Sequence, residues 1–435
     1  MPAKQIVIVG YGTAGREAEL KLQTVAAAAS LAISITVIHP TDFVENTYAM
    51  VDIAARLDGP GRMATTVLPT VAAVGSKKAS TSFVKGLAKS IDAAASTITY
   101  KLPTGTDTAT ISYDALIVAS GVAYDGMRPD LSAYDAADIS AADVGTASRR
   151  TAELKTWHDD HFGADKKKIV IVGGGVLGIE LAMVAKEEVA DREVTLVHSG
   201  NSLLSGATKS FAYAGTTVEA MLAKRGIEVK LGTRASGDAP TVTLTAKADG
   251  TTSTVTVDSI VFTGAGAPHT SFLPANFVDA KGFVLVDQHL QSPIDSKVWS
   301  YGDVAATGLT KHGMAAAVNG GIIAGNIVAS LSSDAPTLTP FVQVEASMFM
   351  VLSNSKDYGV CIASEGSKCK GLLSFCCAWN GWTAMIPCGI LNLALCPNAC
   401  VCKCPAEGRG PAEFHKVRDG FLFLLSIFAL SLTPP

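Results

Sequence analysis

The chain has 435 residues, a formal net charge of −4 and 48% hydrophobic residues, so it can bury the cores of two or three domains. Acidic and basic residues are mixed along it and leave no basic stripe, which argues against nucleic-acid binding. The first apolar run follows Met1 almost directly, without a signal peptide, and Pro2 excludes N-terminal myristoylation. We therefore expect a cytoplasmic protein, with peripheral membrane or lipid contact open only at its C-terminal end.

A glycine-rich turn follows the first predicted strand. Residues 5–19, QIVIVGYGTAGREAE, combine a strand, the spacing Gly10-x-Gly12-x-x-Gly15 and the start of a helix. The first glycine turns the chain, the second lets a pyrophosphate approach the backbone, and the third lets helix and strand pack closely. The free N–H groups and the dipole of the helix N-terminus favour a bound phosphate.

The next predicted strand, residues 34–39, ends at His39, where an acidic residue usually bonds a ribose hydroxyl. Three alternatives stay open: His39 bonds the ribose as a neutral acceptor, Asp42 reaches back to it, or neither touches a cofactor. Short strands are predicted at 82–86, 96–100 and 109–112. Residues 113–121, YDALIVASG, form a buried strand whose small last residues, including Ala119 and Gly121, let backbone lie against a ligand.

Residues 122–167 are polar and alanine-rich, with a helix predicted around 147–158. The cluster WHDDH at 157–161 lies at the end of this helix, so we interpret it as a solvated terminus rather than a metal site. We predict no metal site in the chain.

The glycine pattern recurs about 160 residues later. Residues 168–182, KIVIVGGGVLGIELA, contain a strand, the spacing Gly173-x-Gly175-x-x-Gly178 and a helix predicted to open at Ile179. Two such units, each beginning alternating strands and helices, predict two dinucleotide-binding domains. The second strand of this unit, 193–197, ends in His198 and Ser199 without a carboxylate, which leaves NADH versus NADPH open.

The remaining elements extend the repeat. A helix at 210–225 and strands at 227–231, 241–247 and 252–257 precede residues 259–266, SIVFTGAG, which mirror YDALIVASG and place Gly264 at a strand end. A strand is predicted at 282–286. Residues 297–306, KVWSYGDVAA, then place Gly302 and Asp303 at the carboxyl edge of a sheet, where the carboxylate can accept bonds from ligand hydroxyls or simply cap a helix.

The chain contains the two glycine loops followed by their strand motifs, YDALIVASG, VFTGAG and VWSYGDVAA. Their order and spacing resemble those of the FAD-dependent pyridine nucleotide oxidoreductases of the apoptosis-inducing-factor-like, ferroptosis suppressor protein 1-like family. The resemblance covers roughly residues 1–360. It implies an α/β fold with two Rossmann-like domains, the NAD(P)H domain inserted in the FAD domain, and an incomplete or atypical C-terminal region. The expected parts are FAD-binding 1–121, NAD(P)H-binding 122–283, FAD-binding 284–335, the start of an interface domain at 336–360, and a cysteine-rich apolar tail at 361–435.

The resemblance also implies roles for individual residues. The loop from Gly10 to Gly15, with Thr13 and Ala14, would hold the FAD pyrophosphate, Val84 would meet the adenine, and Asp303 would bond the ribitol chain. The loop from Gly173 to Gly178 would hold the NAD(P)H pyrophosphate. Glu180 would position the nicotinamide or relay protons near the flavin, unless it serves only in packing and dipole pairing at the helix start. Residues 311–328 resemble the helix under the flavin.

Four features depart from the family pattern. His39 replaces the acidic residue, Asn319 stands where relatives often have histidine, and an arginine expected near residue 51 or 52 is absent, with Arg56 the nearest. The fourth departure is the tail, where the resemblance stops near Cys361. We interpret the tail as an alternative or unspliced reading of the gene. Cys396, Cys400, Cys402 and Cys404 lack the paired spacing of structural zinc, and 421–432 is too short to span a membrane.

All nine cysteines lie at or after Cys361, so the first 360 residues hold no dithiol that could take electrons from a flavin. We therefore expect an FAD-dependent NAD(P)H oxidoreductase that passes electrons to a diffusing acceptor of the quinone type. Two alternatives are a reductase of a small redox protein and a nucleotide-sensing protein with little turnover.

Overall fold

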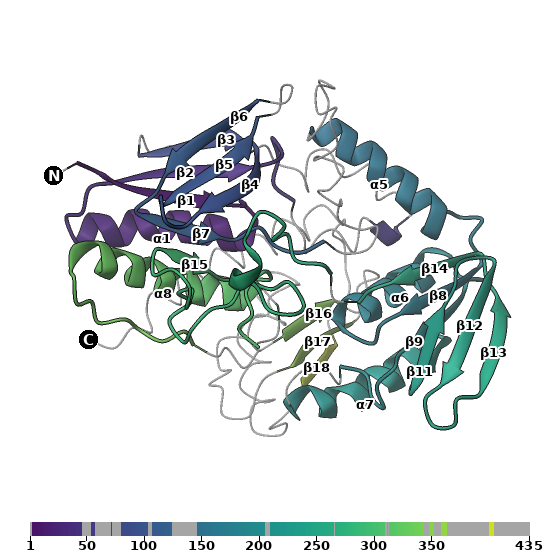
Figure 1. The fold of residues 1–435 in the computed structure, drawn as a ribbon. Helices are drawn as coiled ribbons and strands as arrows, with labels where there is room; N and C mark the ends of the chain where they lie inside the picture. The colour runs from purple at the N-terminus through teal and green to yellow at the C-terminus, as the bar shows by residue number, and fades with distance from the viewer. Residues whose placement is uncertain are drawn as a thin grey trace, which may run out of the picture.

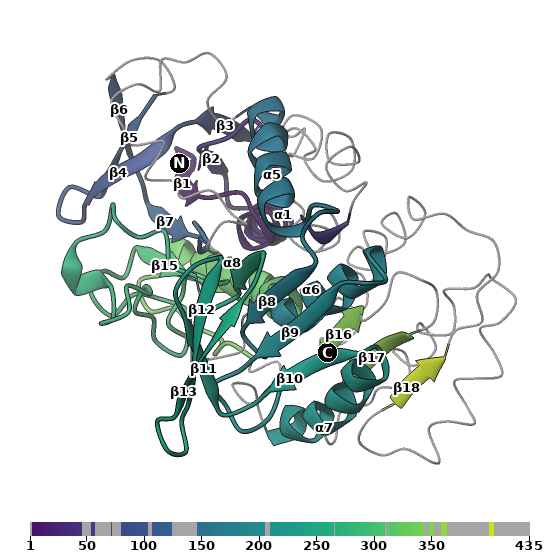
Figure 2. The ribbon, with the colours of Figure 1, turned by 90° about the vertical axis from the view of Figure 1, so that its right-hand side faces the viewer.

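The computed structural model (Figures 1 and 2) contains two α/β domains built on parallel sheets. The α/β fold expected from the sequence is therefore confirmed. The residues that the structure describes are 2–45, 54–56, 71, 80–102, 107–123, 146–204, 209–264, 266–308, 311, 313–342, 348–351, 358–362 and 400–403.

The first domain is organised around a five-stranded parallel sheet in the order β15-β7-β1-β2-β3. On one face of this sheet, the helices α1 and α8 pack against each other (Figure 1). On the other face lies an antiparallel sheet of β4, β5 and β6. The bounds are β1 Lys4–Val9, α1 Thr13–Ala28, β2 Ile33–His39, β3 Thr81–Lys85, β4 Leu87–Asp92, β5 Thr97–Lys101, β6 Thr108–Ser112, β7 Ala115–Val118, β15 Val298–Ser300 and α8 Gly313–Ser332.

Both faces of the first sheet are buried, and β1 illustrates how its sequence meets that requirement. Ile6 and Ile8 join the core under α1 and α8, while Val7 and Val9 join the core against β4 and β5. All four side chains are at most 5% exposed. Successive strand residues point to opposite faces, so a continuous apolar run is what a doubly covered parallel strand requires.

The second domain repeats this architecture with a four-stranded parallel sheet in the order β10-β9-β8-β14. Helices α6 and α7 contribute to the core on one face, and an antiparallel sheet of β11, β12 and β13 covers the other. The bounds are α5 Ala147–Phe162, β8 Lys168–Val172, α6 Val176–Glu188, β9 Glu193–Val197, α7 Lys209–Lys224, β10 Ile227–Lys230, β11 Thr233–Ser236, β12 Thr241–Ala246, β13 Thr252–Thr256 and β14 Ser259–Phe262.

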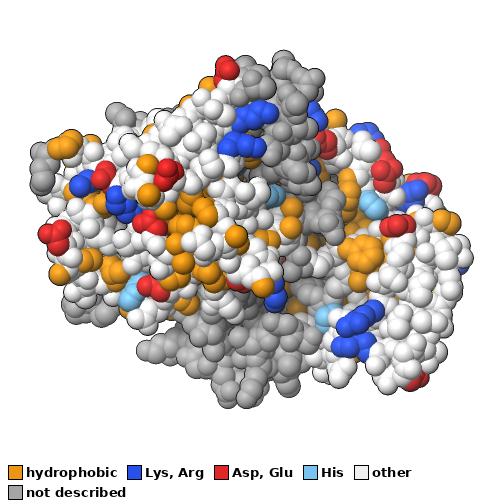
Figure 3. All heavy atoms as spheres, in the orientation of Figure 1, with side chains coloured by type: hydrophobic (Ala, Val, Ile, Leu, Met, Phe, Trp, Pro, Cys, Tyr) orange, Lys and Arg blue, Asp and Glu red, His pale blue; other side chains and the backbone are white. Residues whose placement is uncertain are grey.

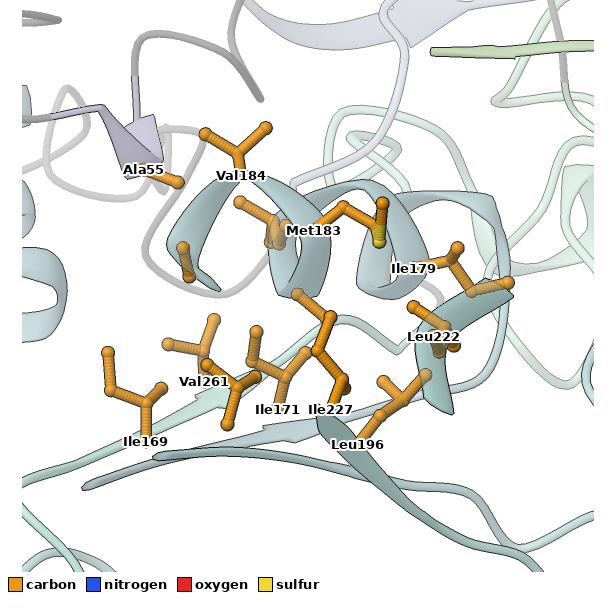
Figure 4. Packing of buried hydrophobic residues seen from close by; sticks show 14 of the residues in the cluster. Ala55, Ile169, Ile171, Ile179, Met183, Val184, Leu196, Leu222, Ile227 and Val261 are labelled. Atoms are coloured by element: carbon orange, nitrogen blue, oxygen red, sulfur yellow. The ribbon is translucent and has the colours of Figure 1, made fainter. Parts of the chain in front are cut away.

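Figure 4 shows the helix side of this second core. Ile179 and Met183 of α6 lie over side chains from the strands below, including Ile171 and Leu196, and all four are at most 1% exposed. Burial of one such side chain stabilises the fold by roughly 1.5–3 kcal/mol, so this face fixes α6 on its sheet. The N-terminus of α6 is thereby held at the carboxyl end of β8.

Two segments that connect the domains, residues 121–123 and 267–269, pair with each other. The amide of Ala123 donates to the carbonyl of Ala267 at 2.8 Å, and that of His269 donates to Gly121 at 3.0 Å. Phe272 and Phe277 then bury in the first domain, against the β4–β6 side of its sheet. Residues 270–283, which we expected in the second domain, therefore pack with the first.

Helix α5 forms a further contact between the domains. His158 is 3% exposed and its Nδ1 lies 2.8 Å from the carbonyl oxygen of Ala54, while Arg150 pairs with Glu45. The expectation of a solvated terminus at 157–161 is wrong for His158, because Ala54 and Ala55 pack with the core of the second domain and cover it. In the described part of the chain, no three metal-ligating side chains come together.

Some elements differ from the sequence predictions. Strands β4 and β11 were not predicted, and 282–286 forms only isolated bridges, one of them between Val284 and Ala305. A small antiparallel sheet joins β16 (Met348–Val351), β17 (Tyr358–Ile362) and β18 (Cys400–Lys403), so part of the tail shares a sheet with the segment before it. Acidic and basic side chains are interspersed on the face in Figure 3. No helix among the described residues is long and apolar enough to cross a membrane.

Candidate functional site: two glycine cradles

The first glycine loop lies between β1 and α1, against the end of β7. Gly10 has φ +94°, and a side chain there would lie 2.4 Å from the carbonyl oxygen of Ala119. The amide of Ala119 in turn donates to Val9 at 2.9 Å. The predicted site residue Ala119 is thus the surface against which the loop turns, and only glycine fits at position 10.

Gly12 and Gly15 have opposite environments. A Cβ at Gly15 would lie 2.0 Å from the carbonyl oxygen of Gly10, so this glycine lets α1 pack onto the loop. A Cβ at Gly12 would meet no protein atom within 4 Å, and no side chain caps the helix that begins at Thr13. The backbone at Gly12 therefore borders open space at the uncapped N-terminus of α1, which suits a phosphate. We call this loop, residues 10–15, the first cradle, and its counterpart at residues 173–178 the second cradle.

The loop after β15 packs on the same helix start. Gly302 has φ +79°, and a Cβ there would lie 2.7 Å from the Cβ of Ala14. Tyr301 reinforces the contact, because its hydroxyl donates to the carbonyl of Ala14. Asp303, half-buried, follows Gly302 directly and is therefore held close to the first cradle.

Lys311 lies close to Asp303, and sequence reasoning assigned it no role beyond starting a helix. Its ammonium group donates to the carbonyl of Ala305 and lies 4.9 Å from the centre of the Phe283 ring. Desolvation lowers the pKa of Lys311, and the carboxylates of Asp303 and Asp279 partly offset this effect. A cation is thus held against the segment that follows Asp303.

The predicted adenosine end of the first cradle contains His39, Asp42 and Val84. His39 uses both ring nitrogens within the protein: Nδ1 accepts from the amide of Tyr11 at 3.2 Å, and Nε2 lies 3.0 Å from the carbonyl oxygen of Phe43. Asp42 is exposed, 4.0 Å from the ammonium of Lys85. Val84 lies beside Ile38 in the sheet. Of the two ribose-bonding candidates, Asp42 is the one with oxygens facing solvent.

The second glycine loop reproduces the first. Gly173 has φ +128°, and a Cβ there would lie 2.3 Å from Oγ1 of Thr263, the residue after β14. A Cβ at Gly178 would lie 2.0 Å from the carbonyl oxygen of Gly173, whereas one at Gly175 would meet nothing within 4 Å. No side chain caps α6. The same open space therefore borders the N-terminus of α6.

Thr263 and Gly264 close one side of this second cradle. The Thr263 hydroxyl donates to the carbonyl of Val172 at 3.0 Å, so it stabilises the strand end under the loop. Gly264 is exposed with nothing within 4 Å of a built Cβ. Thr263 was not singled out in the sequence, although it is the counterpart of Ala119 in the repeated strand. The repeat itself was the signal that could have found it.

His198 closes the other side. Its Nδ1 accepts from the amide of Gly174 at 3.0 Å, the equivalent of the bond between Tyr11 and His39. Burial, and secondarily the positive charge of Lys247, lower the pKa of His198, which favours the neutral imidazole that this bond requires. Lys247 itself donates to the carbonyl of Ser199 at 3.0 Å.

Three further residues singled out in the sequence are buried or paired within the protein. Glu180 is 7% exposed, in the second turn of α6. Asn319 is 5% exposed, and its side chain binds the backbone of Val342. Arg56 lies 3.3 Å from Glu188 of the second domain, so it connects the domains rather than facing the first glycine loop.

Two uncapped helix N-termini, each with a glycine cradle at the carboxyl edge of its own parallel sheet, define a protein with two dinucleotide sites. The family model for pyridine nucleotide-disulphide oxidoreductases matches residues 4–321, and the chain belongs to this family. Its members bind FAD and NAD(P)H, and the two open cradles fit the two cofactors.

Curated relatives are similar over parts of the chain. Dihydrolipoyl dehydrogenase of Geobacillus stearothermophilus is 26% identical over 43% of this chain and 39% of its own length. Oxidoreductase ptaL of Pestalotiopsis fici is 29% identical over 59% and 64%, respectively. Human ferroptosis suppressor protein 1 is 29% identical over 38% and 45%. The matches thus span about half the length of these relatives.

Among solved structures, the sulfide:quinone oxidoreductase of Aquifex aeolicus has a TM-score of 0.65 at 16% identity, covering 98% of this chain and 92% of that one. At this identity the likeness concerns the fold. It extends over both dinucleotide domains.

Proposed function

We propose that this protein is an FAD-dependent NAD(P)H oxidoreductase whose electrons go to a quinone-type acceptor. The observation that carries the proposal is the pair of open cradles at Gly12 and Gly175, each at an uncapped helix N-terminus. FAD at the first would accept a hydride from NAD(P)H at the second and release the electrons to an acceptor.

The residues around the first cradle have binding roles in this proposal. The backbone from Gly12 to Ala14 binds the pyrophosphate, and Asp303 accepts hydrogen bonds from the ribitol hydroxyls. Lys311, whose charge is partly desolvated, supplies a cation on the α8 side of the same site. Around the second cradle, Gly175 and the N-terminus of α6 bind the second pyrophosphate, and Glu180 positions the nicotinamide.

Two observations favour a quinone over a disulfide acceptor. The sequence contains no cysteine before Cys361, so neither cradle has a dithiol in the strands and helices that form it. A dithiol beside the flavin is what disulfide reduction needs. The structural neighbour from Aquifex aeolicus is itself named a sulfide:quinone oxidoreductase. Lipid contact at the C-terminal end would suit such an acceptor and is part of the proposal.

The test begins with the purified full-length protein. Heat release should give about one equivalent of FAD after reconstitution, and NAD(P)H should be oxidised with a soluble quinone but not with lipoamide. Steady turnover of lipoamide would instead place the chain with the disulfide reductases. Binding of both nucleotides without turnover of any acceptor, including small redox proteins, would favour a nucleotide sensor.

A further inference from the structure

The loop after β9, residues 198–204, is joined directly to the second glycine cradle. The amide of Gly174 donates to Nδ1 of His198 at 3.0 Å, and the amide of Leu204 donates to the carbonyl of Gly174 at 2.8 Å. In a dinucleotide-binding unit the end of the second strand faces the ribose of the adenosine. The 198–204 loop therefore borders the 2′ position of a nucleotide whose pyrophosphate lies at Gly175.

This loop carries no negative charge. No Asp or Glu occurs from residue 198 to 218. The first acidic residue, Glu219, accepts from the amide of Leu203 at 3.3 Å and is thereby held at the other end of the loop. A carboxylate that would bond a 2′-hydroxyl and repel a 2′-phosphate is therefore missing from the chain segment that normally supplies it.

A lysine from a different element fills this position. Lys247 follows β12, and its amide donates to Gly232 at 2.8 Å, which ties it beside the loop. Its ammonium donates to the carbonyl of Ser199 at 3.0 Å. Lys247 makes no ion pair with any residue that the structure describes, and Ser199 and Asn201 beside it are exposed. The ammonium of Lys247, the hydroxyl of Ser199 and the amide of Asn201 thus lie at the solvent-facing side of this loop.

The first cradle provides an internal comparison. There the corresponding loop carries Asp42, and the nearby lysine, Lys85, lies 4.0 Å from its carboxylate. FAD has no 2′-phosphate, so a neutralised lysine suits the first site. The second site keeps its histidine in the same hydrogen bond but has lost the carboxylate and retains an unneutralised lysine.

We propose that the second site accepts the 2′-phosphate of NADPH, with Lys247 as the residue that selects for it. The proposal rests on the proposed function in assigning NAD(P)H to this cradle. A lysine ammonium is a compact charge well suited to a phosphate dianion, and Ser199 and Asn201 can donate further hydrogen bonds. The preference for NADPH over NADH then depends on the residue after β12 together with the 198–204 loop.

The test measures binding first, because binding does not require turnover. Adenosine 2′,5′-bisphosphate and 5′-AMP are titrated calorimetrically into the FAD-loaded protein. The native chain should bind the bisphosphate at least 10-fold more tightly than 5′-AMP. Lys247→Gln should remove most of that preference and leave 5′-AMP affinity within about 2-fold, while Lys247→Arg should retain it. Lys230→Gln is the matched control, since Lys230 lies beside the loop but is paired with Glu228 at 2.6 Å.

Kinetics then provide a second readout. The ratio of kcat/KM for NADPH to that for NADH should fall about 10-fold in Lys247→Gln with any acceptor that supports turnover. Equal affinity of the native chain for the two adenosine phosphates would overturn the proposal, and so would equal loss of both ligands in Lys247→Gln. If binding follows the expectation but no acceptor is reduced, the nucleotide assignment stands and the proposed function fails.

Discussion

The amide of Gly174 donates to Nδ1 of His198 at 3.0 Å, and this bond holds the second glycine loop against the end of its second strand. The first unit repeats the arrangement between Tyr11 and His39 at 3.2 Å. Nε2 of His39 faces the carbonyl oxygen of Phe43 at 3.0 Å, so the proton belongs on Nε2 and the lone pair on Nδ1. Both loops therefore depend on a neutral imidazole.

This dependence predicts acid sensitivity. Burial lowers the pKa of His39 from its usual 6.5 to about 4, partly offset by the hydrogen bond to Phe43. The unfolded chain then binds the proton more tightly than the folded one, so the stabilisation is present above pH 6.5 and is lost as the pH falls through about 4. The pKa difference corresponds to up to about 3 kcal/mol.

Urea denaturation between pH 7.5 and pH 4 measures this contribution to the free energy of unfolding. His39→Gln is expected to be less stable at pH 7.5 but to lose less stability on acidification, because glutamine does not titrate. An identical pH profile in the two proteins would show that His39 titrates at its ordinary pKa and that another group causes the acid sensitivity.

Local sequence patterns predicted both glycine loops. Within six residues, each loop needs one glycine to turn the chain, one to leave space for a ligand at the backbone, and one to let the helix pack on the loop. The same patterns placed the start of the second helix at Ile179, whereas α6 begins at Val176. Gly175 is extended and the helix starts directly after it, so the third glycine of the motif lies inside the helix.

Contacts between residues far apart in the sequence could not be predicted, because they follow no local pattern. Lys247 reaches Ser199 across 48 positions, and His158 meets Ala54 across 104. Neither spacing belongs to a helix or a strand, so only the folded chain brings these pairs together. The replacement of the usual acidic residue by His39 looked like a weakness of the cofactor site. The structure gives the histidine a different task, which is to hold the loop of Tyr11.

Reciprocal substitutions in the two cradles should separate the two cofactors. Gly12 and Gly175 are extended, with φ −69° and −82°, and a Cβ at either meets no protein atom within 4 Å, so valine is compatible with folding. Gly175→Val should weaken NAD(P)H binding more than 10-fold and block reduction of the flavin while about one equivalent of FAD stays bound. Gly12→Val should lose FAD.

Heat-released flavin, the nucleotide affinity and the bleaching of flavin absorbance by anaerobic NAD(P)H report the three effects. Loss of FAD in Gly175→Val with retention in Gly12→Val would mean that the assignment of the two units is reversed.

The contact between Gly302 and Ala14 should be essential for the first site. Gly302→Ala places a methyl group 2.7 Å from the Cβ of Ala14 at a φ of +79°, so we expect a loss of about 1–3 kcal/mol in stability and weaker FAD binding. Adding Ala14→Gly removes the steric part and should restore some of the loss, leaving about 1 kcal/mol from the backbone.

The matched control is Gly321→Ala in α8, where a Cβ meets nothing within 4 Å and alanine favours the helix. It should be neutral or slightly stabilising in thermal unfolding of the FAD-loaded protein. Equal effects of Gly302→Ala with and without Ala14→Gly would show that the short contact carries no energy.

The last prediction concerns the cysteine-rich tail. Both glycine cradles are formed by residues before Ala305, and the chain after α8 is tied down where the amide of Val342 donates to Asn319 at 3.0 Å. Deleting 361–435 should therefore leave FAD content unchanged and the rate of flavin reduction within a few-fold. Solubility should rise, because nine cysteines and the apolar run at 421–432 are removed.

A second deletion, of 343–435, also removes β16 and the whole of β17, which contact α6 and α7. It tests whether those strands contribute to flavin reduction or to quinone turnover. Stopped-flow reduction by NAD(P)H and steady-state quinone turnover are the measurements. If the shorter deletion abolishes a quinone turnover that the full chain supports, the tail is a working part of the acceptor site and not an aberrant end.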